Sequence, residues 1–477
     1  MLSSLALLAL SASALAAQTD QPLPEPKMYG VNLGNFLVAE PWMMPNEWLE
    51  MGGENCSGCV CIASEGQLAL QIGQNATDAI LQKHWSTWFT NADADRIAAA
   101  GLNTVRIPLG WWIVESLVDR TTEPPYARGG MDVLKSRLRY LKGKGLHTVL
   151  DLHAVPGVGH VNQQFAGLCT NVVNFYNDAN YERAMIWGGV MTAMSHLDPD
   201  FESVYEIGAI NEPINNAANT PNLGQYYTDY VQVVRAVEKA VGVFFPGATL
   251  PEGVDPRASV TDIILAIAEK QPDLGTNARN ALTKIVPALE EHARKYHFKI
   301  EKCAKDRKPL FTNFQDIYRQ WGPRPNPYDS ADGPATYDNH LYFSFSMQGK
   351  NASAAAYMQY LCNFPRIAID QSFNNTPVLF GEWSLATQWD YDASVVRWNS
   401  TETAPPTAEF LRQFADAQKY TMTTLGDGWF YWSFKIEEGS TQKRSWDYFE
   451  AVEQGFFPHQ AGELFDPNVC DPYIGLE

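Results

Sequence analysis

The stretch "YEIGAINEPINN" (residues 205–216) begins like a buried strand and ends in polar residues. Its first half is largely apolar, whereas Asn211 and Glu212 follow directly and Pro213 ends the run. A strand that is packed on both faces needs apolar residues, so an amide and a carboxylate at its end are misplaced for packing. Pro213 disfavours helical dihedral angles at Glu212, and we therefore expect Glu212 to be extended. The stretch predicts a strand that delivers Asn211 and Glu212 to a functional site.

Seven further strand-like runs accompany this one. They are "YGVNLG" (29–34), "NTVRIPL" (103–109), "HTVLDLH" (147–153), "PLFTNF" (309–314), "TYDNHLYF" (336–343), "PVLFGEW" (377–383) and "GWFYWSF" (428–434). Helical patterns such as "MDVLKSRLRYLKGKG" separate most of them. Eight strands that alternate with helices predict an α/β fold, the (β/α)8 TIM barrel. An open doubly wound sheet is the alternative, but no Gly-rich phosphate loop follows the first strand.

One segment does not fit the repeat. Residues 247–307 carry two extra helical patterns, "SVTDIILAIAEKQ" and "NARNALTKIVPALEEHARKYH", and Pro287 is expected to kink the second. The segment is too long for an ordinary loop. We expect one catalytic domain over residues 18–477, with a helical insertion at about 247–307 between the fourth helix and the fifth strand.

The N-terminus resembles a secretory signal. "LALLALSASALAA" is a short apolar run that ends in small residues, which predicts a signal peptide over residues 1–17. No later run approaches the length of a membrane span. We therefore expect a secreted protein, extracellular or in the cell wall. Five N-x-S/T sequons agree with export and possible glycosylation: Asn55, Asn75, Asn351, Asn374 and Asn399.

The cysteines favour the same compartment. There are seven: Cys56, Cys59, Cys61, Cys169, Cys303, Cys362 and Cys470. In a secreted chain they predict up to three disulfides with one thiol left over, in an order that the sequence leaves open. "CSGCVC" could suggest a metal knuckle, but no matching Cys/His pair follows it. We expect neither a metal nor a cofactor.

Composition narrows the choice of partners. The 477-residue chain has a formal net charge of −19, which disfavours nucleic acid and anionic membranes as partners. Aromatic residues make up 12% of the chain, and flat rings suit the C–H faces of sugars. A neutral carbohydrate is therefore the expected substrate, and we expect a monomer.

Polar side chains stand near the ends of most predicted strands, where a TIM barrel places its chemistry. They are Arg106, His153, Asn211, Glu212, His340, Tyr342, Glu382 and Trp432. His340 and Tyr342 are two residues apart and share one face of their strand.

Two carboxylates across a sugar-sized site are what glycosidic bond hydrolysis requires. One carboxyl protonates the leaving oxygen, and the other is ionised and attacks carbon or activates water. Arg106 and Tyr342 can hold Glu382 in its ionised form. Glu212 has no such evident cation, so we expect it to keep its proton, with His340 as the neighbour that tunes it.

At these residues the chain resembles glycoside hydrolase family 5, and in particular its fungal exo-1,3-β-glucanases. The blocks that carry the resemblance are "GVNLGNFLVAEPW", "AGLNTVRIPLGWW", "DLHAVPG", "NEP", "HLY", "GEWS" and "WFYWSFK", in the order of the family. The resemblance implies Glu212 as acid/base and Glu382 as nucleophile. It implies a sugar-binding set formed by Glu40, Arg106, His153, Asn211, His340, Tyr342 and Trp432.

The resemblance also implies two geometric features. A retaining mechanism needs the carboxyl groups of Glu212 and Glu382 roughly 5–5.5 Å apart. In the family the peptide bond after the last Trp is often cis, so we expect a cis Trp432–Ser433 bond that lays the indole flat beneath the sugar.

Departures from the family leave the linkage open. Gly34-Asn35-Phe36 replaces a usual Gly-Gly-Trp, and "VGHVNQQFAG" replaces a Gln-Asn-Gly segment that contacts sugar. The first interpretation is a secreted, retaining β-1,3-glucan hydrolase, exo or endo. The alternatives are the same chemistry on β-1,6-glucan or mannan and, from another class, a barrel that binds carbohydrate without catalysis.

Overall fold

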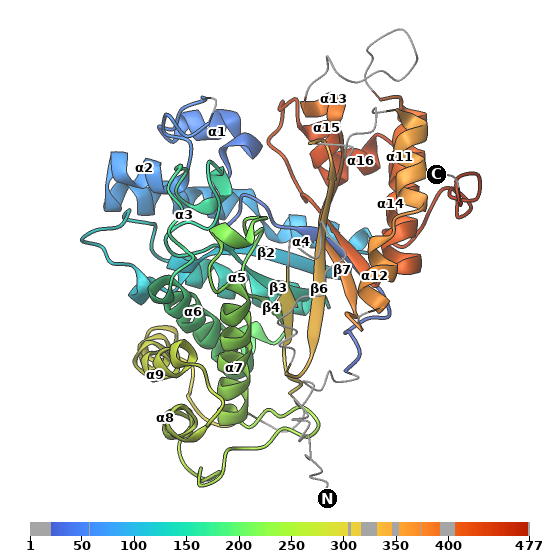
Figure 1. Ribbon diagram of the computed structural model, residues 1–477. Helices are drawn as coiled ribbons and strands as arrows, with labels where there is room; N and C mark the ends of the chain where they lie inside the picture. Colours follow the sequence, from blue (N-terminus) through green and yellow to red (C-terminus); the bar gives the residue numbers. More distant parts are fainter. Residues whose placement is uncertain are drawn as a thin grey trace, which may run out of the picture.

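The computed structural model describes residues 21–56, 58–303, 307–315, 332–345, 353–372, 374–391 and 406–475. Within this part eight parallel strands close into a barrel, in chain order around the ring (Figure 1). They are β1 (Met28–Asn32), β2 (Thr104–Gly110), β3 (His147–Ala154), β4 (Val204–Gly208), β5 (Phe311–Phe314), β6 (Ala335–Phe343), β7 (Val378–Thr387) and β8 (Gly428–Tyr431). Both the predicted strands and the (β/α)8 fold are confirmed.

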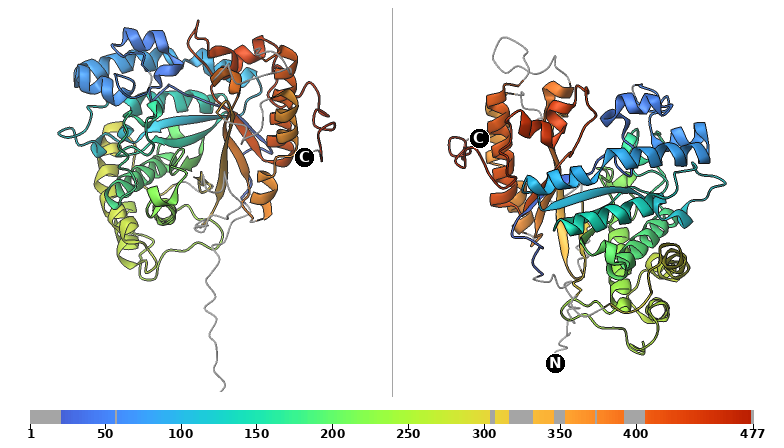
Figure 2. Two further views of the ribbon diagram at one scale, coloured as in Figure 1. Left: turned by 45° about the horizontal axis from the view of Figure 1, so that its top comes forward. Right: turned by 180° about the vertical axis from the view of Figure 1, so that it is seen from behind.

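Helices surround this barrel (Figure 2). Those of the first half are α1 (Pro45–Glu50), α2 (Glu65–Ile72), α3 (Gln74–Trp88), α4 (Asn91–Ala99), α5 (Gly130–Gly143), α6 (Asp178–Leu197), α7 (Leu223–Val241), α8 (Val260–Lys270) and α9 (Thr276–Tyr296). Those of the second half are α11 (Ala354–Cys362), α12 (Arg366–Ser372), α13 (Gln388–Tyr391), α14 (Ala408–Tyr420), α15 (Lys443–Trp446) and α16 (Tyr448–Glu453). In this part of the chain, none of the helices combines the length and the apolarity that crossing a membrane requires.

The barrel strands are apolar because helices cover one face and the barrel interior covers the other. Every residue of β2 and of β7 is buried. The outer helices show the complementary pattern. Helix α5 buries Met131, Leu134, Leu138 and Leu141, which recur at the spacing of one helical face.

The insertion covers α6 and α7 on their outer side. Helices α8 and α9 pack against each other and against these two helices, at the lower left of Figure 1. Gly189 of α6 allows the close approach, since a Cβ there would lie 2.2 Å from Ile285 of α9. This second layer explains why α6 is buried on nearly all sides. Pro287 lies inside α9, and the helix continues past it.

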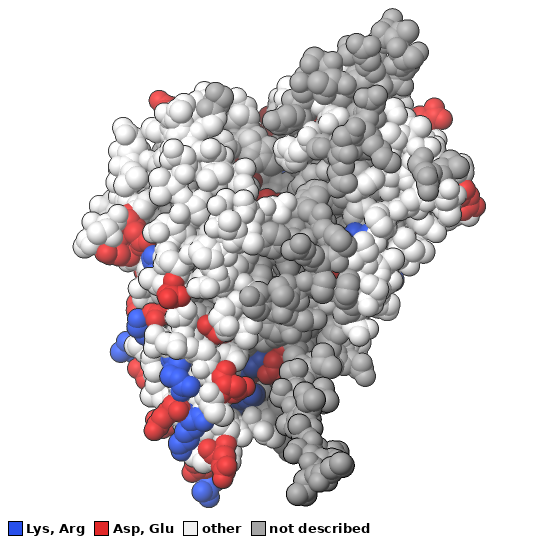
Figure 3. All heavy atoms as spheres, in the orientation of Figure 1, with Lys and Arg blue, Asp and Glu red and all other residues white. Residues whose placement is uncertain are grey.

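The outer surface of this layer carries interspersed charges of both signs (Figure 3). Two of its lysines reach helices or loops of the barrel: Lys284 pairs with Glu182, and Lys295 pairs with Glu115 at 2.9 Å. Exposed pairs of this kind contribute little energy each. The apolar contact with α6 and α7 is therefore what holds the insertion in place.

One expectation about β4 is wrong. The strand ends at Gly208, so Asn211 and Glu212 lie in the loop that follows it. Glu212 is not extended, because its φ is +41°, in the left-handed region that side chains other than glycine rarely adopt. Such a conformation costs on the order of 1–3 kcal/mol and persists where the surroundings fix it.

The carboxyl ends of the strands lie at the upper end of Figure 1. Helices α1, α13 and α15, which follow β1, β7 and β8, are at this end. The face is hollowed near its top, and acidic side chains show inside the hollow (Figure 3). This is the end at which a TIM barrel places its active site.

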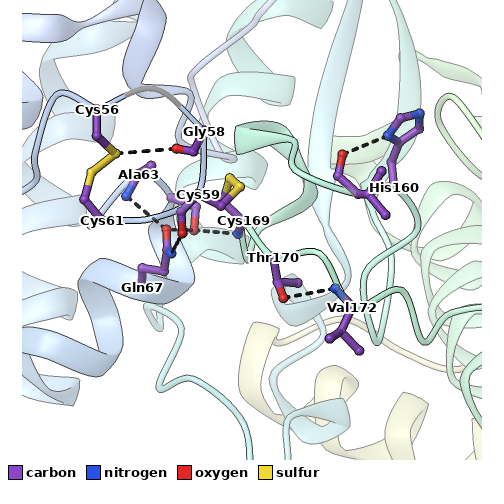
Figure 4. The surroundings of a disulfide bond; sticks show 12 residues. Cys56, Gly58, Cys59, Cys61, Ala63, Gln67, His160, Cys169, Thr170 and Val172 are labelled. Atoms are coloured by element: carbon purple, nitrogen blue, oxygen red, sulfur yellow. Dashed lines mark hydrogen bonds between the residues drawn. A yellow bond between two sulfur atoms is a disulfide. The ribbon is translucent and has the colours of Figure 1, made fainter.

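Two disulfides fasten loops beside this end (Figure 4). Cys59–Cys169 joins the segment before α2 to the loop after β3, and Cys56–Cys61 closes a small loop next to it. The Ser64 hydroxyl also accepts a hydrogen bond from the Cys169 N–H at 2.9 Å. A third disulfide, Cys362–Cys470, ties the C-terminal segment to α11, and Cys303 is not in a disulfide. Three disulfides and one thiol agree with the prediction from the cysteine count. The predicted signal peptide, residues 1–17, lies outside the described residues.

Removing the Cys59–Cys169 bond tests this attachment. Cys59→Ala with Cys169→Ala should lower the free energy of unfolding by about 2–5 kcal/mol, because the bond closes a long loop in the unfolded chain. Urea unfolding measures the change. Cys303→Ser is the control, since this thiol closes no loop, and an equal loss in both proteins would contradict the expectation.

Candidate active site

The nine residues predicted for the site lie together at the carboxyl ends of the strands. Arg106 lies in β2, His153 in β3, His340 and Tyr342 in β6, and Glu382 in β7. Glu40, Asn211, Glu212 and Trp432 lie in loops after β1, β4 and β8. His340 and Glu382 are register partners of neighbouring strands. The chain folds so that seven of the eight strands or their following loops contribute one or more of these side chains.

Glu382 is held by a cation and a phenol. Its Oε1 accepts a hydrogen bond from Arg106 Nη1 at 2.8 Å, and its Oε2 accepts one from the Tyr342 hydroxyl at 2.7 Å. The side chain is buried, with 4% of its surface exposed. Charge-assisted bonds to both oxygens fix the orientation of the carboxylate.

Glu212 faces Glu382 across His340. The Nδ1 atom of His340 lies 2.8 Å from Oε1 of Glu212 and 3.4 Å from Oε2 of Glu382. One oxygen of each glutamate lies within 4.8 Å of the other. Two oxygens this close fit the carboxyl separation of roughly 5–5.5 Å in retaining glycosidases better than the roughly 6.5–9.5 Å of inverting ones.

The same three side chains could also hold a metal ion. One atom each of Glu212, His340 and Glu382 lies within 4.8 Å of the others. The His340 nitrogen that would ligate an ion is, however, the one that contacts both carboxylates. A proton on this nitrogen satisfies both glutamates, so the geometry also fits a hydrogen-bonded trio.

A second group of residues lies on the opposite side of Arg106. Arg106 Nη2 lies 3.0 Å from Asp151 Oδ2, which also accepts a hydrogen bond from His153 Nδ1 at 2.6 Å. His153 Nε2 lies 4.0 Å from Glu40 Oε1. The bond after Trp432 is cis, as predicted, and its ring stacks on His153 with centroids 5.5 Å apart. The Trp432 ring is buried, so its service as a sugar platform stays a prediction.

Several buried polar atoms of the site have no partner among the described residues. They are Glu40 Oε1, His153 Nε2, Asn211 Nδ2 and Gln315 Nε2. On two of these side chains the second polar atom is hydrogen-bonded. Trp42 Nε1 donates to Glu40 Oε2 at 3.0 Å, and Arg106 Nη2 donates to Asn211 Oδ1 at 2.8 Å. A buried polar atom without a partner is costly, which is typical of a site that awaits a ligand. Hydroxyl groups can both donate and accept, so sugar hydroxyls fit all four atoms.

Burial and charge set the protonation of the trio. Burial favours a neutral His340, but Glu382, Asp338 and Glu212 outweigh it and raise the pKa of His340 to about 10. Burial raises the pKa of Glu382 and so opposes the ionised form expected for it, while His340 and Arg106 favour that form. Burial also acts on Glu212, but the hydrogen bond and the charge of His340 prevail and lower the pKa of this carboxyl.

The prediction that Glu212 lacks a cation and keeps its proton is therefore wrong for the unliganded protein. His340 is that cation, and it carries the proton that the sequence interpretation gave to Glu212. Elsewhere in the site, burial raises the pKa of Glu40 to about 7 against the opposing charge of His153.

Sequence reasoning missed residues that hold the predicted ones. Asp151 binds Arg106 and His153, and Asp338 lies 3.5 Å from His340 Nε2. Each stands two residues before a predicted histidine, so strand alternation could have found both. Asn32, which accepts from Arg106 at 2.9 Å, and Gln315, which accepts from the Glu212 N–H at 2.6 Å, follow no such pattern.

The raised pKa of His340 predicts how its contribution to stability depends on pH. The charged ring stabilises the fold fully below its ordinary pKa of 6.5, and this contribution disappears as the pH rises toward about 10. The free energy of unfolding of wild type should therefore exceed that of His340→Gln by the largest amount near about pH 6 and by the smallest amount near about pH 10. Urea unfolding across the range measures the difference. His459→Gln, outside the trio, controls for the loss of a histidine, and a difference that grows with pH would contradict the assignment.

Comparison with known proteins agrees with this geometry. The family model described as "Cellulase (glycosyl hydrolase family 5)" matches residues 70–438. A probable glucan endo-1,6-beta-glucosidase B of Aspergillus terreus is 26% identical over 447 residues, which are 93% of this chain and 89% of that protein. The glucan endo-1,6-beta-glucosidase B of Emericella nidulans is also 26% identical, over 93% of this chain and 88% of its own. A probable glucan 1,3-beta-glucosidase A of Neosartorya fischeri is 31% identical, but over 45% of this chain and 48% of its own.

Among solved structures, rutinosidase from Aspergillus niger matches with a TM-score of 0.54 and 18% identity, over 90% of this chain and 97% of that one. At this identity the match shows a shared fold. The family model, in contrast, covers more than half of the chain, including both glutamates. The chain belongs to glycosyl hydrolase family 5 and is a glycoside hydrolase.

Proposed function

We propose that this protein is a secreted, retaining β-1,6-glucanase that cleaves within the glucan chain, with Glu382 as nucleophile and Glu212 as acid/base. The observation that carries the proposal is the placement of the two glutamates, with oxygens within 4.8 Å of each other and Glu382 bonded to Arg106 and Tyr342. A carboxylate so held can attack the anomeric carbon, and the short distance between the two oxygens supports a retaining rather than an inverting mechanism.

The first step forms a glycosyl-enzyme. Glu382 attacks the anomeric carbon from one side while Glu212 protonates the departing oxygen on the other. Arg106 and the Tyr342 hydroxyl keep the attacking carboxylate in one orientation, so little reorganisation is needed in the transition state. The second step brings water to the same carbon, with Glu212 now as base, and the configuration is retained.

His340 supplies the proton for the first step. In the free protein the proton lies on His340, whose Nδ1 is 2.8 Å from Glu212 Oε1. A bound sugar covers Glu212, excludes water from it and so raises its pKa, which moves the proton from His340 to Glu212. Esterification of Glu382 then removes a negative charge from the trio, which lowers the pKa of Glu212 and suits it to act as base.

The relatives favour the 1,6 linkage over the β-1,3-glucan of the first sequence interpretation. Relatives named endo-1,6-beta-glucosidases align with 93% of this chain, whereas the relative named 1,3-beta-glucosidase aligns with 45%. The sequence departures from the 1,3-glucanases lie beside the same site. Asn35 has a left-handed φ of +59°, its Oδ1 accepts from the Glu40 N–H at 2.6 Å, and Gln164 accepts from the Trp42 N–H at 3.0 Å. The parts that differ from 1,3-glucanases thus shape the surroundings of Glu40.

Secretion is supported by the three disulfides, which persist in oxidising compartments. The alternative of a barrel that binds sugar without catalysis is disfavoured by the site itself. A buried Glu382 and a half-buried Glu212 that share one histidine are costly to maintain, and binding alone does not require them.

Substrate comparison tests the linkage. Reducing-end release should be fastest on pustulan, a β-1,6-glucan, and at least about tenfold slower on laminarin and mannan, because a misplaced linkage loses about 1.4 kcal/mol or more of transition-state binding. Product sizing should show short oligosaccharides of several lengths from the start. Laminarin as the preferred substrate, or glucose as the sole early product, would replace the proposal with its 1,3 or exo alternative.

Variants of the two glutamates separate their roles. Glu212→Ala should lose about 10²–10⁴-fold on glucan but keep appreciable turnover on a dinitrophenyl glycoside, which needs little acid assistance, and azide should accelerate it. Glu382→Ala should be nearly inactive on every substrate, and azide should give the inverted glycosyl azide if any.

Thermal melting of both glutamate variants comes first, because their activities can be compared only if both are folded. Neither change leaves a core cavity, so we expect both proteins to fold. Similar partial activities in the two variants, or the two phenotypes exchanged, would overturn the assignment of acid/base and nucleophile.

A further inference from the structure

Gln315, the residue that follows β5, connects Glu212 to the barrel. Its Oε1 accepts a hydrogen bond from the Glu212 N–H at 2.6 Å, and its main-chain carbonyl accepts one from the Tyr227 hydroxyl of α7, also at 2.6 Å. Gln315 is 1% exposed and Tyr227 is 2% exposed. The Tyr227 ring packs against Phe314, with ring centroids 5.6 Å apart. Gln315 is thus fixed at its main chain and at its side-chain oxygen.

These contacts define which way the Gln315 amide faces. A backbone N–H can only donate, so the atom that meets the Glu212 N–H must be the amide oxygen. The amide nitrogen, Nε2, then points away from this contact and has no hydrogen-bond partner in the described part of the chain. A buried NH2 group of this kind is a donor ready for a ligand.

The hydrogen bond from the Glu212 N–H to Gln315 Oε1 restrains the strained backbone of Glu212. Glu212 has a φ of +41°, and the following Pro213 disfavours the ordinary helical region at this position. A left-handed residue persists where its neighbours determine it. The described acceptor of the Glu212 N–H is Gln315, so this side chain helps to fix the backbone from which the Glu212 carboxyl extends.

Asn211 and Gln315 flank Glu212 with similar amides. Asn211 bonds through its oxygen to Arg106, which also bonds Glu382, and so it lies on the side of the nucleophile. Within the described residues, the Gln315 side chain bonds to Glu212 and not to this arginine network. In a retaining enzyme the acid/base lies on the side of the departing sugar. The Gln315 Nε2, which has no hydrogen-bond partner among the described residues, therefore belongs with the sugar that leaves.

We propose that Gln315 is a positioning residue for the acid/base and a binding residue for the departing sugar. Its amide oxygen holds Glu212 so that the carboxyl meets the glycosidic oxygen, and its Nε2 donates a hydrogen bond to a hydroxyl of the leaving sugar. The proposal rests on the proposed role of Glu212.

Two variants separate the two contributions. Gln315→Met keeps the length of the side chain but loses both the acceptor and the donor. Gln315→Glu keeps an acceptor for the Glu212 N–H and loses the donor. Gln418→Met is the matched control, because Gln418 is also a buried glutamine, on α14, whose amide donates to the Ser384 carbonyl at 3.2 Å. Thermal melting checks each protein before kinetics.

The measurement is kcat/KM on β-1,6-glucan and on a series of aryl glycosides with leaving groups of increasing pKa. Gln315→Met should lose about 10–100-fold on glucan and less than about 3-fold on the most activated aryl glycoside, with a steeper dependence on leaving-group pKa across the series. Gln315→Glu should restore the wild-type slope on aryl glycosides and remain slow on glucan, because the donor is still missing. Gln418→Met should change neither the slope nor the ratio of the two activities.

Glu212→Ala is measured beside them, so that the two proposals fail separately. If Glu212→Ala shows no dependence on the leaving group, the role of Glu212 itself is wrong. If Glu212→Ala shows it and Gln315→Met retains the wild-type slope and ratio, Gln315 neither positions the acid nor binds the leaving sugar. A Gln315→Met protein that fails to fold leaves Gln315→Glu to decide, and wild-type activity of that variant on glucan would overturn the binding role.

Discussion

The rest of the site depends on the buried guanidinium of Arg106. It lies within hydrogen-bonding distance of Asn32, Asp151, Asn211 and Glu382, which come from β1, β3, the loop after β4 and β7. A buried charge is tolerated only where it is paired and hydrogen-bonded, so these partners must approach Arg106 together. The rigid fork of donors also fixes their directions, which a lysine ammonium could not do. One residue thereby aligns four parts of the barrel and orients Glu382, the proposed nucleophile.

A second constraint is the number of protons that the trio holds. His340 lies among Glu212, Asp338 and Glu382. Among the described residues, it is the cation that these three carboxyl groups share, apart from Arg106. Coupled groups titrate as a unit, so the proton belongs to the trio as a whole. This arrangement lets one proton move to Glu212 when sugar excludes water, without any change in the net charge of the site. The chemistry of the two glutamates is thus set by a histidine between them.

The surroundings of the site explain how these side chains stay in place. The disulfide Cys59–Cys169 restrains the loop after β3, whose Gln164 bonds to the main chain of Trp42, and the Trp42 indole in turn bonds to Glu40. On the other side, α8 and α9 cover α7, whose Tyr227 supports Gln315. Strands carry five of the nine site residues and loops carry the other four, and bonds to rigid elements give those loops their precision.

The sequence predicted the barrel well because parallel strands buried on both faces are apolar runs of recognisable length. It also predicted the polar residues at the strand ends, such as His340 and Glu382, since they are out of place for packing. It did not predict the left-handed Glu212, because the acceptor for its N–H, Gln315, is distant in the chain. It placed the proton on Glu212 because the charge of His340 depends on Glu382 and Asp338, which only the fold brings to it. Local sequence patterns therefore predict the strands, the helices and the polar residues at the strand ends. Backbone strain and protonation depend on contacts between elements that are distant in the chain.

Covalent trapping tests whether the carboxylate held by Arg106 is the nucleophile. A 2-deoxy-2-fluoro glycoside with a good leaving group slows the hydrolysis of a glycosyl-enzyme more than its formation, so the intermediate accumulates and peptide mass spectrometry can locate it. If Glu382 is the nucleophile, we expect one sugar per chain, attached to Glu382 in the "GEWS" segment, and no attachment in Glu382→Ala. A sugar attached to Glu212 or to another residue, or inactivation of Glu382→Ala at the wild-type rate, would contradict it.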